Sequence, residues 1–181
     1  LDRSSAASDV YKRQELFARR LGWQLRGWLL SLPAGIGFAT LRAILKLSIG
    51  FPPNRSGVYS AGNGPAMRVA IIGAVFAHDS TRRTAYVAAS TRITHIDPKA
   101  LTGATAIAEL SAWIVREGLT QRPPLEPFLA LLRGCGPDDR DWQTRVEAIE
   151  RAAQADQTVA ELAESLGLAR GVSGYIYHTV P

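Results

Sequence analysis

Cysteine, long apolar runs and, over one long stretch, carboxylates are scarce in this sequence of 181 residues. The single cysteine, Cys135, excludes a disulfide framework and a thiolate zinc site, so we expect a reducing, cytoplasmic compartment. The longest charge-free apolar stretch, residues 27–41, has 15 residues and contains Pro33. A membrane-spanning helix needs about 20 apolar residues, so we expect neither a transmembrane helix nor a membrane partner.

Carboxylates are absent between Leu16 and His78, where seven Lys and Arg residues occur. As a result, residues 1–92 carry a net charge of +9 and residues 93–181 one of −4. A basic half indicates an anionic partner such as a nucleotide, a nucleic acid or a membrane surface. The alternative is that this charge difference is an accident of composition without functional meaning.

Both ends of the sequence differ from ordinary domain ends. Residues 1–14 lack a starting Met, an apolar h-region and a periodic apolar face, and they resemble translated sequencing-adapter read-through. We therefore expect residues 1–14 to be an artefact outside the fold, and residues 15–181 to be the central portion of a single domain. Residues 174–181 have the pattern of the start of a buried helix, so we expect sequence to be missing at both ends.

Apolar spacing of three and four residues predicts helices along the whole chain. They are expected at Glu15–Leu32, Gly37–Ser48, Ala66–Phe76, Ser80–Arg92 and from Asp97–Pro98 to Gly118, with two or three more after Pro124. Asp79, Asp97 and Thr158 are the expected N-caps, and Thr158 with Glu161 forms a capping box. No segment alternates as a strand would. The predicted fold class is all-α, a compact multi-helix orthogonal bundle.

A glycine-rich loop, residues 59–65, runs directly into the predicted helix at Ala66. Unpaired amides and the positive end of a helix dipole would face a ligand there, an arrangement that suits phosphate or pyrophosphate. The candidate ligand-binding residues are Ser60, Gly62, Asn63, Gly64 and Arg68. A plain turn between two helices is the alternative.

His95 precedes the predicted cap Asp97 by two residues, at the mouth of the same bundle. It is a candidate ligand for phosphate or ribose, or else it orders the loop through Asp97 or a backbone carbonyl. The acidic residues 138–141 are interpreted as a charged helix start, Cys135 has no nearby base, and His178 is expected to be packed. The tryptophans, expected in the core or partly buried, are Trp23, Trp28, Trp113 and Trp142.

Together these motifs resemble the ADP-ribosylglycohydrolase family, the relatives of dinitrogenase-reductase-activating glycohydrolase. The loop motif is matched by Ser60, Gly62, Asn63, Gly64, Ala66, Met67 and Arg68. The Thr-His-x-x-Pro-x-Ala segment is matched by Thr94, His95, Pro98 and Ala100, and the closing motif by Ser173, Gly174, Tyr175 and Thr179. Order and spacing agree over about residues 16–181.

The resemblance implies an enzyme with an all-α fold and two magnesium ions. Such an enzyme hydrolyses the N- or O-glycosidic bond of ADP-ribose in a modified protein or related conjugate. In such an enzyme the Gly62–Gly64 loop would hold phosphates and ribose, with His95 nearby. The expected partner is ADP-ribose or an ADP-ribosylated protein or small molecule, and the expected state is a monomer.

The chain departs from the family where the metals bind. The family's Asp-Asp-Thr and Asp-x-Asp-Thr motifs are both missing, and no catalytic or metal-ligating residue is assigned. We therefore expect an incomplete fold that supplies the binding loop without the metal ligands, and no hydrolase activity from this chain alone. A non-catalytic ADP-ribose or nucleotide binder is the alternative, and a basic helical nucleic-acid-binding protein is a third interpretation.

Overall fold

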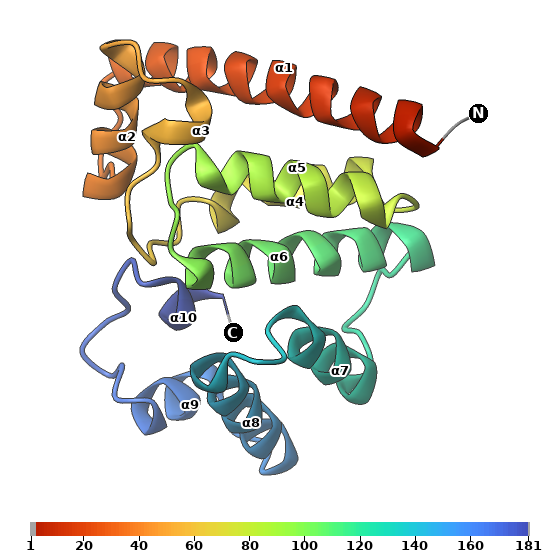
Figure 1. Cartoon of the computed structure of the whole chain (residues 1–181). Helices are drawn as coiled ribbons and strands as arrows, with labels where there is room; N and C mark the ends of the chain where they lie inside the picture. The colour runs from red at the N-terminus through yellow and green to blue at the C-terminus, as the bar shows by residue number, and fades with distance from the viewer. Residues whose placement is uncertain (1–2, 181) are drawn as a thin grey trace.

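The computed structural model describes residues 3–180 and consists of helices joined by short loops (Figure 1). The helices are α1 (Arg3–Leu30), α2 (Phe38–Ser48), α3 (Pro53–Ser56), α4 (Ala66–Val75), α5 (Ser80–Arg92), α6 (Pro98–Glu117), α7 (Leu125–Cys135), α8 (Arg140–Gln154), α9 (Val159–Ser165) and α10 (Ile176–Thr179). Within residues 3–180, β pairing is limited to isolated bridges. The predicted all-α class is confirmed.

The helix ends follow the signals read from the sequence. The predicted N-caps are Asp79, Asp97 and Thr158, and the side chain of each accepts a hydrogen bond from a backbone amide of the first helical turn. The reciprocal bond from Glu161 completes the predicted capping box at Thr158. Gly118 ends α6 with φ of +62°, a left-handed conformation that glycine adopts without a steric penalty.

Two elements extend beyond the prediction. α1 begins at Arg3 rather than Glu15, so it includes residues expected to lie outside the fold. This segment contains neither Gly nor Pro after Arg3, so nothing in it stops the helix. The predicted loop at residues 50–57 contains the short helix α3, which starts at Pro53, and proline presets φ at a first helical position.

The centre of the molecule is the pair α4 and α6, which lie along one another with α5 and α1 beyond them (Figure 1). The two backbones approach so closely that a Cβ on Gly73 would lie 2.2 Å from the carbonyl oxygen of Ala108. The apolar residues buried along this side are Val69, Ile72, Val87, Ala104 and Ala108. Small side chains on α6 thus allow α4 to pack closely against it, and this packing fixes the position of the loop that precedes α4.

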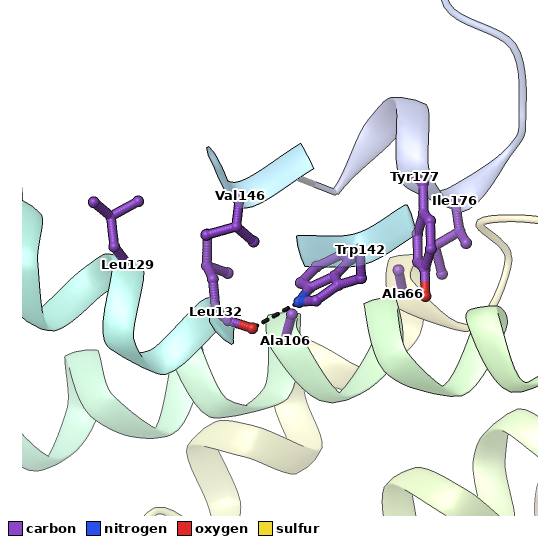
Figure 2. Close-up of a cluster of buried hydrophobic side chains, with 8 residues drawn as sticks. All are labelled: Ala66, Ala106, Leu129, Leu132, Trp142, Val146, Ile176 and Tyr177. Carbon is purple, nitrogen blue, oxygen red and sulfur yellow. Dashed lines mark hydrogen bonds between the residues drawn. The ribbon is translucent and has the colours of Figure 1, made fainter. Parts of the chain in front are cut away.

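A second core cluster joins α6 to α7, α8 and α10 (Figure 2). Its largest member is Trp142, which is fully buried and donates from Nε1 to the carbonyl oxygen of Leu132 at 2.7 Å. Ile176 and Tyr177 of α10 are also buried there, as expected for a buried helix start. Trp23 and Trp28 are 69% and 44% exposed, so neither lies in the core, and for Trp23 the expectation of a core or partly buried position is wrong.

α5 is tied to α6 by a buried ion pair. Arg83, 4% exposed, donates from Nε and Nη2 to the two carboxylate oxygens of Glu109, both at 2.8 Å. Its Nη1 donates to the carbonyl oxygens of Phe76 and Ala77, so one guanidinium fixes the turn after α4 as well. Among the helices of residues 3–180, none combines the length and the hydrophobicity required to cross a bilayer.

Candidate ligand-binding site

The glycine-rich loop is paired with a segment from the other end of the chain. Asn63 donates its amide to the carbonyl oxygen of Gly174 at 2.9 Å, and Ile176 donates its amide to that of Ala61 at 2.8 Å. These bonds form the isolated antiparallel bridge between Gly62 and Tyr175. The loop motif and the closing motif of the sequence therefore lie side by side, although they are far apart in the chain.

The loop then enters α4 through Pro65. Met67 donates its amide to the carbonyl oxygen of Asn63 at 3.2 Å, and Arg68 donates its amide to that of Pro65 at 3.1 Å. Within residues 3–180, the amides of Gly62, Gly64 and Ala66 donate no such bond. Unpaired amides at a helix start are the groups that bind phosphate in many proteins.

A second loop segment brings His95 beneath this loop. Val58 donates its amide to the carbonyl oxygen of Thr94 at 3.1 Å, and Ile96 donates its amide back to Val58 at 3.0 Å. The two strand-like segments run parallel and place the imidazole of His95 under the glycines. A Cβ on Gly62 would lie 2.7 Å from Nε2 of His95, and one on Gly64 would lie 3.1 Å from Cε1.

His95 is a buried, neutral imidazole. Its side chain is 2% exposed, and its Nδ1 lies 2.8 Å from Oγ1 of Thr94. Burial, together with the positive charge of Arg68, lowers the pKa of His95 to about 4, although Asp97 partly opposes this shift. At neutral pH the ring is therefore uncharged. Its hydrogen bond goes to the Thr94 hydroxyl and not to Asp97 or a backbone carbonyl, which the loop-ordering alternative had expected.

Arg68 lies inside the site rather than on its surface. It donates from Nε and Nη2 to Oγ and the carbonyl oxygen of Ser90, at 3.1 and 2.8 Å. It also donates from Nη1 to the carbonyl oxygen of Gly64 at 3.1 Å and from Nη2 to Oγ1 of Thr94 at 2.6 Å. Burial lowers the pKa of Arg68 to about 10, so it stays charged at neutral pH while bracing the loop and the His95 segment.

Ser60 and Asn63 are the loop's polar side chains. Both residues are half-buried, and neither side chain hydrogen-bonds to another of the described residues. They are therefore available to a ligand together with the loop amides. Two surface hollows of about 310 and 450 Å³ lie along α1 and share no residue with this loop.

Sequence reasoning missed a hydrogen-bonded triangle beside the loop, formed by Lys99, Asp141 and Tyr175. Nζ of Lys99 donates to Oδ2 of Asp141 at 2.7 Å and to the hydroxyl of Tyr175 at 3.1 Å, and that hydroxyl donates to Oδ2 of Asp141 at 3.0 Å. The hydrogen bond from Lys99 holds the pKa of Asp141 below its usual range. No spacing rule predicts this triangle, because its members come from three distant segments.

The acidic residues 138–141 act as the charged helix start that the sequence indicated. Asp139 accepts the amide of Trp142 at 3.0 Å with one carboxylate oxygen and the hydroxyl of Tyr177 at 2.7 Å with the other. Burial raises the pKa of Cys135 to about 12, so its thiol stays protonated. His178 packs edge-on against the ring of Tyr175, as expected.

The described residues do not fit the two magnesium ions that the family resemblance implies. Magnesium requires several oxygen ligands in near-octahedral geometry. Across residues 3–180, no three His, Cys, Asp or Glu side chains come together in a group that could hold a metal ion. The carboxylates of Asp139 and Asp141 are already engaged by Tyr177 and Lys99. We derive no reaction step through magnesium.

These residues define an all-α domain that presents a glycine-rich loop over a buried histidine. The chain belongs to the ADP-ribosylglycohydrolase family, which it matches over residues 3–181. It is also 37% identical over 105 residues to an uncharacterized protein of Archaeoglobus fulgidus. That match covers 58% of this chain and 33% of the archaeal protein, so the chain spans only part of this relative. No solved structure matches the chain.

Proposed function

We propose that this chain supplies the phosphate- and ribose-binding loop of a magnesium-dependent ADP-ribosyl hydrolase. The observation that carries the proposal is the Gly62–Gly64 loop, which combines unpaired amides, a helix start and a buried neutral histidine. Membership in the ADP-ribosylglycohydrolase family supports the same ligand. The substrate class is ADP-ribose linked to a protein or to a related small conjugate.

The chemistry of the loop suits a pyrophosphate joined to ribose. Amide donors at the start of α4 stabilise phosphate oxygens, and the helix dipole adds to that attraction. The side chains of Ser60 and Asn63 offer further hydrogen bonds for ribose hydroxyls. The absence of carboxylates from Leu16 to His78 removes repulsion for a doubly charged ligand.

The magnesium dependence in this proposal rests on the family, and no step through the metal is assigned to this chain. The ligands of the metal would come from outside these 181 residues. The part assigned to this chain is to bind and orient the ligand, so we expect the chain alone to release no ADP-ribose from a modified protein, with or without magnesium. Magnesium-dependent release would overturn that assignment.

A non-catalytic ADP-ribose binder is the second candidate. It is favoured by the failure of the described acidic residues to assemble a metal site. Both candidates require the loop to bind ADP-ribose, and they differ in whether the gene encodes the missing metal motifs beyond both ends of this sequence. Sequencing the source DNA across both ends separates them.

The first test is calorimetric titration of the 181-residue protein with ADP-ribose. We expect saturable binding that Asn63→Ala weakens about tenfold, because one hydrogen-bonding side chain is removed at the loop. Asn54→Ala, at an exposed position of α3, is the matched control and should leave the affinity unchanged. Equal weakening by both variants, or no binding at all, would contradict the proposal. Binding to DNA or RNA that falls steeply with salt would instead favour the nucleic-acid interpretation.

A further inference from the structure

The side chain of His95 has one nitrogen with a partner and one without. Nδ1 lies 2.8 Å from Oγ1 of Thr94, whereas Nε2 makes no hydrogen bond to any of the described residues. The edge of the ring that carries Nε2 faces the two loop glycines, Gly62 and Gly64. Nε2 is not one of the fully buried, unpartnered side-chain atoms of the described residues, so a water molecule or a ligand oxygen can reach it and act as its acceptor.

The hydrogen on the Thr94 hydroxyl decides the tautomer of His95. Nη2 of Arg68 lies 2.6 Å from Oγ1 of Thr94 and can only donate, so the hydroxyl oxygen accepts there. The hydroxyl hydrogen has one acceptor in reach among the described residues, which is Nδ1 of His95. If Nδ1 carried a hydrogen instead, the hydroxyl would face two donors and its own hydrogen would have no acceptor.

We propose that Thr94, itself held by Arg68, is a positioning residue that fixes His95 in the tautomer with its hydrogen on Nε2. His95 then presents a single N–H donor at the floor of the Gly62–Gly64 loop, for an acceptor oxygen of the ligand. This inference rests on the proposed function for the identity of that ligand, but the tautomer itself is a property of the protein without ligand.

The assignment makes His95 a donor and not a base. With Nδ1 occupied by Thr94 and Nε2 protonated, the ring has no lone pair left to accept a proton from a bound substrate. The charged groups that act on it are Arg68, which opposes protonation, and Asp97, which favours it. Because burial acts in the same direction as Arg68, the ring remains neutral throughout the physiological pH range.

Nitrogen chemical shifts of the ¹⁵N-labelled 181-residue protein test the tautomer directly. His95→Asn identifies which of the three histidine signals belongs to His95. We expect Nε2 protonated and Nδ1 unprotonated between about pH 5.5 and 8, well above the lowered pKa of His95. A hydrogen on Nδ1, or a ring that becomes charged within this range, would overturn the inference.

Two substitutions of Thr94 test its role. Thr94→Val removes the hydroxyl at nearly constant shape, so a fraction of His95 should change to the other tautomer and the affinity for ADP-ribose should fall roughly tenfold. Thr94→Ser keeps the hydroxyl, so it should retain the wild-type tautomer of His95 and the wild-type affinity for ADP-ribose. Circular dichroism confirms that each variant folds. A Thr94→Val protein that matches the wild type in tautomer and affinity would overturn the role of Thr94.

The same experiments separate this inference from the proposed function. If the wild-type tautomer is as expected and Thr94→Val changes it, but ADP-ribose does not bind, then the positioning role stands and the proposed ligand is wrong. If ADP-ribose binds and Asn63→Ala weakens it while the tautomer is the opposite one, then the proposed function stands and this inference fails.

Discussion

At the scale of single residues, the loop glycines and His95 require one another. Gly62 and Gly64 look from the sequence like a loop shaped for phosphate, and that explanation treats their lack of side chains as space for a ligand. The structure adds a second reason, because the imidazole of His95 occupies the space that a Cβ would need on either glycine. The two motifs of the sequence are therefore parts of one packed unit.

Gly62→Ala is expected to damage the site through this contact. A Cβ 2.7 Å from Nε2 of His95 must displace the ring or the loop, so we expect ADP-ribose affinity to fall at least tenfold and the free energy of unfolding to fall by about 1–3 kcal/mol. Titration calorimetry and urea denaturation measure the two effects.

Gly174→Ala is the control for that substitution. It lies in the segment paired with the loop, but its added Cβ would be 3.8 Å from Oδ1 of Asn63, an ordinary contact distance. This variant should keep both affinity and stability. If Gly62→Ala behaves in the same way, the close packing of His95 against the loop is wrong.

At the scale of elements, the position of the loop depends on how α6, α8 and α10 are joined. Lys99 from α6 and Asp141 from α8 hold the hydroxyl of Tyr175, and the backbone next to Tyr175 pairs with the loop. The isolated bridge contributes few hydrogen bonds of its own. The triangle of side chains is thus expected to set where the segment at residues 173–175 lies.

Asp141→Asn should loosen this attachment in a pH-dependent way. The pKa of Asp141 is lowered in the folded protein, so its contribution is complete above the ordinary value of about 4 and is lost as the pH falls through the lower, folded value. The side chains of Lys99 and Asp141 are both more than a third exposed. We therefore expect the substitution to lower the free energy of unfolding by no more than about 1 kcal/mol at pH 7.

Urea denaturation at several pH values checks this expectation. The difference in unfolding free energy between Asp141→Asn and the wild type should shrink as the pH falls below the lowered pKa of folded Asp141, because the carboxyl is then protonated in both states of the wild type. Asp138→Asn, an exposed neighbour with no side-chain hydrogen bond in the described structure, should match the wild type throughout. A pH-independent loss for Asp141→Asn would mean that its charge is not what holds Tyr175.

At the scale of the whole molecule, local signals predicted the helices and non-local packing determined the site. Caps such as Asp97 and Thr158 act within one turn, so the sequence contains all the information that places them. The parallel contact that brings His95 under the loop, and the triangle around Tyr175, depend on which helices pack together. Periodicity does not contain that information, so the loop residues and His95 could be named from the sequence, whereas Lys99 and the arrangement of the site could not.

The two faces of α4 differ in a way that tests the packing of the whole fold. Ile72 is 7% exposed and faces α6, whereas its neighbour Ile71 is 67% exposed on the same helix as the exposed Met67 and Val75. Ile71→Lys should therefore change the free energy of unfolding by less than about 0.5 kcal/mol and raise solubility, because it interrupts an exposed apolar stripe.

Ile72→Lys is the matched change at the next residue. It buries a charge against α6, so it should prevent folding or lower the free energy of unfolding by more than about 3 kcal/mol. Urea denaturation and sedimentation measure both, and equal damage from the two substitutions would show that the outer face of α4 is covered in solution.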